Sequence, residues 1–93
     1  MSGYSHYVIA YDISCDQERS RVEKILLGVG FRVQKSVFEV RLNRGGHERL
    51  IGVLEGLHLK TGFIKIYTLG SQAHHRVVGE APPSLDEAFA FVV

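Results

Sequence analysis

The sequence predicts a single α+β domain, in which a four-stranded antiparallel sheet carries two helices on one of its faces. Two observations predict this fold. Segments of strand composition and segments of helical periodicity follow one another in the order strand, helix, strand, strand, helix, strand, and a chain of 93 residues has room for one hydrophobic core. Right-handed crossovers and layer packing turn that order into the ferredoxin-like βαββαβ plan. We expect residues 1–80 to form this domain.

The first strand is predicted at residues 6–12, an apolar run that is rich in aromatic and β-branched side chains. Ser14, followed three residues later by Gln17, has the form of a capping box, so a helix is expected to begin there. Glycines at positions 28 and 30 are expected to end it. The apolar residues of this helix recur at helical spacing and are Val22, Ile25, Leu26 and Val29.

The segment from residue 31 to residue 42 alternates between apolar and polar residues, but the phase of the alternation changes partway. The apolar residues stand first at odd positions and then at even ones: Phe31 and Val33, then Phe38, Val40 and Leu42. One straight strand cannot change phase, and twelve residues at ~3.3 Å each would span ~40 Å, which is too long for so small a domain. We therefore predict a turn or bulge at residues 34–36, which gives two strands or one sharply bent strand.

Residues 43–46 have the composition of a loop, after which the apolar pattern returns to helical spacing. Gly62 is expected to close this second helix, and residues 63–69 then return to strand composition. The apolar residues of the second helix are Leu50, Ile51, Leu54 and Leu57.

This plan leaves one face of the sheet without helices. The first strand is apolar on both faces, so something is expected to cover the second face, and self-association is the simplest cover. Residues 72–79 are a candidate short edge strand. Residues 85–93 would expose several apolar side chains unless they dock on a sheet edge. We expect the tail, residues 81–93, to supply an extra C-terminal edge strand that docks across a dimer.

The charge is distributed unevenly along the chain, although the net charge is only +1. Between Arg19 and Arg49 eight basic residues face three acidic ones, a net charge of +5, and the rest of the chain carries −4. A near-neutral protein can therefore present one positive face, as a phosphate-binding protein does. The alternative is that these charges lie on solvated helix and strand surfaces.

Other features bear on the compartment. No segment approaches the ~20 apolar residues that span a bilayer, and the first residues lack a secretory signal, so we expect a cytoplasmic protein without membrane contact. The single cysteine, Cys15, cannot form an internal disulfide, which fits a reducing compartment.

Asp12 is the strongest candidate for chemistry, because it puts a carboxylate at the end of an apolar strand and near the start of a helix. The alternative is that it hydrogen-bonds the following turn. One carboxylate is a small part of a metal site, yet Mg²⁺ keeps several waters and is often held by one or two carboxylates. A two-fold axis that brought two copies of Asp12 together would suffice. A metal there could polarise a phosphoryl oxygen and lower the pKa of a bound water for attack on a phosphodiester.

Other candidate ligands are weaker. His74 and His75 are adjacent, so on a strand they would point to opposite faces, and the remaining three histidines have no zinc-like spacing. Cys15 has no histidine near it in sequence and is assigned to structure. Gly45–Gly46 does not belong to a phosphate-loop or dinucleotide fingerprint.

Four blocks of the sequence carry a resemblance to a known family. They are Tyr11–Ser14, then Arg19 and Arg21, then Gly30–Glu39, and later Val78–Glu80. Together they resemble the CRISPR-associated protein Two (Cas-two) family over residues 6 to 80. The resemblance implies a ferredoxin-like fold and a two-fold dimer whose apposed strand-end aspartates bind a divalent metal, Mg²⁺ or Mn²⁺.

Residue by residue, the resemblance implies that Asp12 is the metal ligand, one from each protomer, and that Tyr11 is its catalytic neighbour. It implies that three arginines contact or steer phosphates: Arg19, Arg21 and Arg32. Phe38 matches a position near the site, although its place in the apolar register favours the core. The sequence departs from many members at Lys35, where an aromatic residue is frequent, and at His74–His75.

The resemblance also implies a function. Members act as metal-dependent endonucleases on RNA or DNA, and they bridge two integrase dimers of the Cas-one type when new CRISPR spacers are captured. We therefore expect a homodimer that binds double-stranded DNA, and in a nuclease role single-stranded RNA. The alternatives are a scaffold without catalysis and a ferredoxin-like regulatory module with a small-ligand pocket at the dimer seam.

Overall fold

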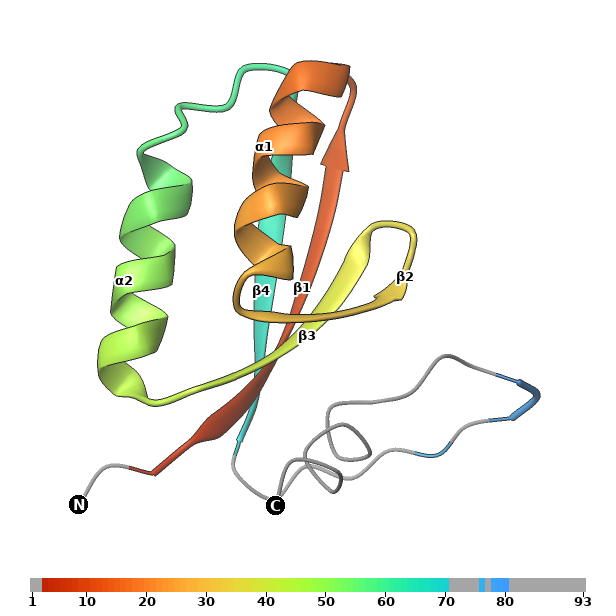
Figure 1. Cartoon of the computed structure of the whole chain (residues 1–93), viewed down its shortest axis with the longest axis vertical. Helices are drawn as coiled ribbons and strands as arrows, with labels where there is room; N and C mark the ends of the chain where they lie inside the picture. The colour runs from red at the N-terminus through yellow and green to blue at the C-terminus, as the bar shows by residue number, and fades with distance from the viewer. Residues whose placement is uncertain (1–2, 71–75, 77, 81–93) are drawn as a thin grey trace.

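Four strands form one sheet in the computed structural model, which describes residues 3–70, 76 and 78–80. The helices and strands follow in the order β1 (Ser5–Ile13), α1 (Asp16–Leu27), β2 (Gly30–Gln34), β3 (Val37–Leu42), α2 (Arg44–Glu55) and β4 (Gly62–Gly70). The spatial order in the sheet is β2-β3-β1-β4, and all neighbouring strands are antiparallel. Both helices lie on the same face of the sheet (Figure 1). The predicted fold is therefore confirmed.

The hydrophobic core lies between this face and the two helices. Alternate residues of β1 point into it, as the period of two in a strand requires. The buried core residues are Tyr7, Ile9, Tyr11, Ile13, Val22, Leu26, Phe38, Val40, Leu50 and Leu54. The intervening residues of β1 therefore point to the face that carries no helix.

The predicted break at residues 34–36 is confirmed. β2 ends at Gln34 and β3 begins at Val37, and the pairing between them shifts register between Arg32 and Gln34. The change of phase arises because Phe31 and Phe38 point to opposite faces of the sheet. Phe31 pairs with Glu39 on the helix-free face, whereas Phe38 is fully buried on the helix side.

The helix boundaries differ from the sequence predictions. The capping box predicted at Ser14 and Gln17 does not form: the N-cap of α1 is Cys15, and no side chain caps the helix there. The reason is that the backbone amides of this turn have other partners. The amide of Ser14 donates to the carbonyl oxygen of Thr61 at 3.1 Å, and that of Cys15 donates to Thr61 Oγ1 at 3.0 Å.

The second helix begins and ends earlier than predicted. Residues 43–46 do not form a loop, because Asn43 is the N-cap of α2 and its side chain accepts a hydrogen bond from the amide of Gly46 at 2.8 Å. The helix ends at the C-cap Gly56. Gly62 therefore does not close the helix but begins β4.

The tail predicted at residues 81–93 lies outside the described residues, and so do His74, His75 and most of the candidate edge strand at residues 72–79.

Candidate functional site

Asp12 lies near the end of β1 on the face of the sheet that carries no helix. It is exposed, while its neighbours Tyr11 and Ile13 are buried on the helix side. Its partner across the sheet is Phe63, the second residue of β4, whose side chain is 53% exposed. Within the described part of the chain, no hydrogen bond or ion pair engages the Asp12 carboxylate. It does not cap the following turn there, so it remains available for a ligand.

The described residues of one chain do not complete a metal site. They contain no group of three or more His, Cys, Asp or Glu side chains that could hold a metal ion together. The Asp12 carboxylate is an oxygen ligand of the kind that Mg²⁺ prefers, and its exposure leaves room for bound waters. The donor set therefore fits Mg²⁺ if a second carboxylate comes from another chain.

Tyr11 does not stand beside Asp12, because adjacent residues of a strand point to opposite faces. Its hydroxyl donates to Glu23 Oε2 on α1 at 2.7 Å and lies 3.2 Å from the carbonyl oxygen of Lys35. Burial, and then the hydrogen bond to Glu23, raise the pKa of Tyr11 to about 12. The structure thus separates the two residues that the resemblance places together, and it puts the Tyr11 phenol in a hydrogen-bonded network on the helix side.

Arg32 belongs to the same network. Its guanidinium lies 3.3 Å from Glu23 Oε1 and 5.4 Å from the centre of the Phe38 ring. Phe38 is fully buried, as its register predicted, and its ring meets that of Tyr11 at 6.3 Å. Arg32 is 40% exposed but already has an anionic partner, so a phosphate would have to compete with Glu23 for it.

The two arginines of α1 differ from each other. Arg19 Nη1 donates to the carbonyl oxygen of Ile13 at 2.8 Å, and its other terminal nitrogen pairs with Asp16. Arg21 is exposed on the helix surface. The three arginines predicted to contact phosphate therefore differ in their surroundings. Arg19 is bonded to the end of β1, Arg32 is in an ion pair with Glu23, and Arg21 is exposed on α1.

A group that the sequence analysis missed holds the turn that follows β1, two residues beyond Asp12. Glu18, in the first turn of α1, accepts hydrogen bonds from the segment that precedes β4, and Thr61 is at the centre of them. More than forty residues separate these partners in the chain, so no local pattern reveals them. Gly62 gives the only local signal, a glycine at the start of a predicted strand, which is typical of a close backbone approach.

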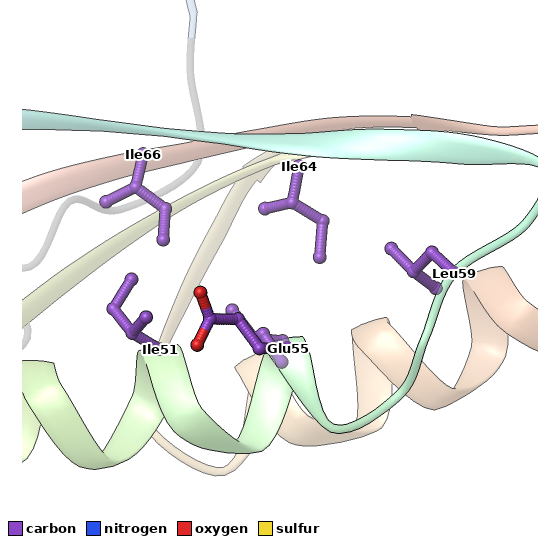
Figure 2. A pocket seen from close by; sticks show the side chains of 6 residues that line it. Ile51, Glu55, Leu59, Ile64 and Ile66 are labelled. Atoms are coloured by element: carbon purple, nitrogen blue, oxygen red, sulfur yellow. The ribbon is translucent and has the colours of Figure 1, made fainter.

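A cavity of about 290 Å³ lies between α2 and β4, on the helix side of the sheet (Figure 2). Its walls are apolar except for the Glu55 side chain, which comes from α2, and Ile64 and Ile66 point into it from β4. None of its lining residues is a predicted site residue. It lies on the opposite side of the sheet from Asp12.

Within the described residues, no helix is long and apolar enough to cross a membrane.

Comparisons with known proteins agree with this fold. The family model described as CRISPR associated protein Cas2 matches residues 5–77. A protein of Mycobacterium tuberculosis named CRISPR-associated endoribonuclease Cas2 is 32% identical over 89 residues, which cover 96% of this chain and 79% of that protein. A Thermus thermophilus protein of the same name is 42% identical over 69 residues, which cover 73% of each chain.

Solved structures give the same picture. The crystal structure of a hypothetical protein from Thermus thermophilus superposes with a TM-score of 0.76 at 32% identity, and the match covers 87% of this chain and 98% of that one. A crystal structure described as that of Cas2 superposes with a TM-score of 0.72 at 24% identity, covering 89% of this chain and 98% of that one. The second likeness concerns the fold alone.

Proposed function

The chain belongs to the CRISPR associated protein Cas2 family, and we propose that it is a metal-dependent endonuclease whose site is shared by the Asp12 residues of two copies. The observation that carries the proposal is the placement of Asp12. It is an exposed carboxylate at a strand end, on a sheet face without helices, and it has no partner among the described residues. The relatives in Mycobacterium and Thermus carry the name endoribonuclease, which supports cleavage of a phosphodiester.

A second copy supplies what one chain lacks. The helix-free face carries half-buried Val8 and Ala10 on β1 beside the half-exposed rings of Phe63 and Tyr67 on β4. Apolar side chains on an uncovered sheet face favour self-association, and a two-fold axis that passed close to Asp12 would place the two copies of that residue opposite one another. Asp12 shares this face with those apolar side chains, so such a contact would bring two carboxylates toward each other.

The residues of the chain have distinct roles in this mechanism. When bound, Mg²⁺ or Mn²⁺ supplies a polarised phosphoryl oxygen and a water of lowered pKa. The Asp12 carboxylates of two copies would hold the cation, and their exposure leaves room for water and phosphate beside it. Arg21 is exposed and steers the nucleic-acid backbone, whereas Arg19 and Arg32 are partly engaged within the protein.

The substitution Asp12→Asn tests the catalytic role. It should abolish cleavage that depends on Mg²⁺ or Mn²⁺ and leave the melting temperature nearly unchanged, because the carboxylate is exposed and makes no hydrogen bond or ion pair with the described residues. Glu55→Gln is the matched control, since it removes an exposed carboxylate from the opposite side of the sheet. Full cleavage by a well-folded Asp12→Asn variant would exclude the mechanism.

Mixing subunits tests whether the site is shared. When wild type and Asp12→Asn exchange freely in equal amounts, about one quarter of the dimers carry two Asp12 residues, so activity should fall to about one quarter if both are needed. Activity of about one half would mean that each copy has its own site.

Arg21→Ala tests the contact with nucleic acid. Loss of one phosphate contact should reduce the slope of log affinity against log salt by about 0.9 for duplex DNA or about 0.7 for a single strand. Arg32→Ala should change the slope less, because its guanidinium is paired with Glu23. Equal slopes for Arg21→Ala and wild type would exclude Arg21 from the interface.

We also propose that the dimer bridges two integrase dimers of the Cas-one type on double-stranded DNA during spacer acquisition. The support is electrostatic: exposed basic side chains occur on α1, on α2, on β3 and in the β2–β3 turn, and they do not depend on Asp12. If bridging is the main role, Asp12→Asn should still support spacer capture with its integrase. Loss of capture by the well-folded variant would contradict a role as scaffold alone.

A further inference from the structure

Glu18 makes an unusual set of contacts for a partly exposed carboxylate. It lies in the first turn of α1, yet all its hydrogen-bond donors come from the segment before β4. The amide of Lys60 donates to Oε2 at 2.9 Å, the amide of Thr61 donates to Oε1 at 3.0 Å, and Thr61 Oγ1 donates to Oε1 at 2.5 Å. Both carboxylate oxygens are therefore used, and α1 is tied to the start of β4.

Thr61 extends this contact to the residues that follow Asp12. Its hydroxyl accepts from the amide of Cys15 at 3.0 Å, and its carbonyl oxygen accepts from the amide of Ser14 at 3.1 Å. Because the single hydroxyl proton of Thr61 goes to Glu18, its oxygen is free to accept from Cys15. We call the group formed by Ser14, Cys15, Glu18, Lys60 and Thr61 the strand-end clasp.

The clasp adjoins a close contact between the two strand backbones. Asp12 pairs with Phe63 and Ile13 pairs with Gly62, which follows Thr61 directly. A Cβ atom at residue 62 would lie 1.9 Å from the carbonyl oxygen of Asp12 and 2.7 Å from the Cα atom of Ile13. The backbone of Asp12 is thus bounded by β4 on one side, and the two residues that follow its strand, Ser14 and Cys15, are held by the clasp.

We propose that Glu18 is a positioning residue for Asp12, because it fixes the clasp that sets where the Asp12 carboxylate leaves the sheet. This inference rests on the proposed function. Mg²⁺ requires nearly ideal octahedral geometry with oxygen ligands at about 2.0–2.1 Å, so a site built from one carboxylate of each copy has little tolerance for a displaced strand end. Glu18 itself touches neither metal nor substrate.

The test measures Mn²⁺ binding to the purified full-length dimer directly, by electron paramagnetic resonance, in parallel with cleavage. Glu18→Ala should weaken Mn²⁺ binding about tenfold, the lower end of what loss of a supporting contact costs a metal site. Thr61→Val should do the same, since it keeps the shape of the side chain but removes the hydroxyl. Thr61→Ser keeps the hydroxyl and should restore the affinity of the wild type.

A control separates positioning from loss of stability. Val40→Ala creates a core cavity on β3 opposite Tyr7, five residues along β1 from Asp12 or about 17 Å, and should lower the melting temperature without changing Mn²⁺ affinity. If Val40→Ala weakens binding as much as Glu18→Ala at a similar melting temperature, Glu18 acts only through stability and the inference fails.

The remaining outcomes are equally distinct. If the wild-type dimer binds no Mn²⁺, or if Asp12→Asn binds it normally, the proposed function itself fails. If Asp12→Asn abolishes binding while Glu18→Ala and Thr61→Val bind Mn²⁺ as the wild type does, the shared site stands and the positioning role of Glu18 is refuted.

Discussion

Removal of the Tyr11 hydroxyl should destabilise the protein and leave its chemistry intact. The hydroxyl donates to the Glu23 carboxylate at 2.7 Å, and hydrogen bonds to charged groups contribute about 1.5–3 kcal/mol. In Tyr11→Phe, Glu23 keeps its ion pair with Arg32, and its side chain is 25% exposed, so water can replace part of the lost hydrogen bond. We therefore expect a loss at the lower end of this energy range. For a domain of this size about 1.5 kcal/mol corresponds to a melting temperature lower by roughly 6–12 °C.

Differential scanning calorimetry of Tyr11→Phe measures this shift, and Tyr4→Phe is the matched control. Tyr4 is 52% exposed, and the guanidinium of Arg41 lies over its ring, 5.6 Å from the ring centre. Tyr4→Phe keeps that ring, so the melting temperature of this variant should stay within a few degrees of the wild type. Metal-dependent cleavage by Tyr11→Phe, measured well below its melting temperature, should equal that of the wild type, because the phenol lies on the opposite face from Asp12.

Two results would refute this reasoning. An unchanged melting temperature would mean that the bond to Glu23 contributes nothing. Loss of cleavage and of Mn²⁺ binding without loss of stability would give Tyr11 the catalytic role that the resemblance implies and that its placement in one chain does not support.

The alkaline pH dependence gives an independent check on the same bond. The pKa of Tyr11 is raised to about 12 from its usual 10.0, chiefly by burial and then by the hydrogen bond to Glu23. A raised pKa means that the stability gained from the protonated phenol is complete below pH 10 and is lost as the pH rises toward 12. The difference in stability between wild type and Tyr11→Phe should therefore narrow across that interval, because the two proteins differ only in the Tyr11 hydroxyl.

Two further predictions concern the strand-end clasp and its surroundings. Hydrogen bonds from Thr61 and from the amide of Lys60 lower the pKa of Glu18 below its usual 4.5, so the stability from its ionised form is present above that pH and is lost as the pH falls through the lowered value. The acid limb of melting temperature against pH should be shallower in Glu18→Gln, and identical limbs would contradict the contact. Gly62→Ala should destabilise by about 3 kcal/mol or more in urea unfolding, because its Cβ would overlap the Asp12 carbonyl. Gly52→Ala, with open space around an exposed position inside α2, should instead stabilise by about 0.5–1 kcal/mol, and equal effects of the two substitutions would contradict the register of β4.

The sequence carried enough information for the fold because its signals were periodic. The change of phase between Phe31 and Phe38 predicted the division of β2 from β3, and the structure places it at the predicted residues. Helix boundaries were less predictable, since they depend on partners elsewhere in the chain. Ser14 had a suitable partner in Gln17, but the amides of that turn bond to Thr61, more than forty residues away.

The candidate site was predictable in part. The sequence indicated Asp12 as a carboxylate at the end of an apolar strand, and the structure places it near the end of β1, exposed on the helix-free face. The alternation that separates His74 from His75 applies equally to Tyr11 and Asp12, so the separation of these two side chains was available from the sequence. The pairing of Arg32 with Glu23 was not, because it joins β2 to α1 and needs the packed structure.

The two faces of the sheet at the end of β1 have different roles: the helix side contributes to stability, and the helix-free side carries the candidate metal ligand. On the helix side, Tyr11, Glu23 and Arg32 satisfy one another, which neutralises an anion close to the core and leaves little charge for a ligand. On the other side, Asp12 is the exposed acid, and the apolar residues around it favour a second copy of the chain. Substitutions should therefore separate cleanly: those on the helix side change stability before activity, and those at Asp12 change metal binding before stability. A variant such as Arg32→Ala that lost metal binding while it kept its melting temperature would show that the two faces are coupled, and the shared-carboxylate site would then need residues from both.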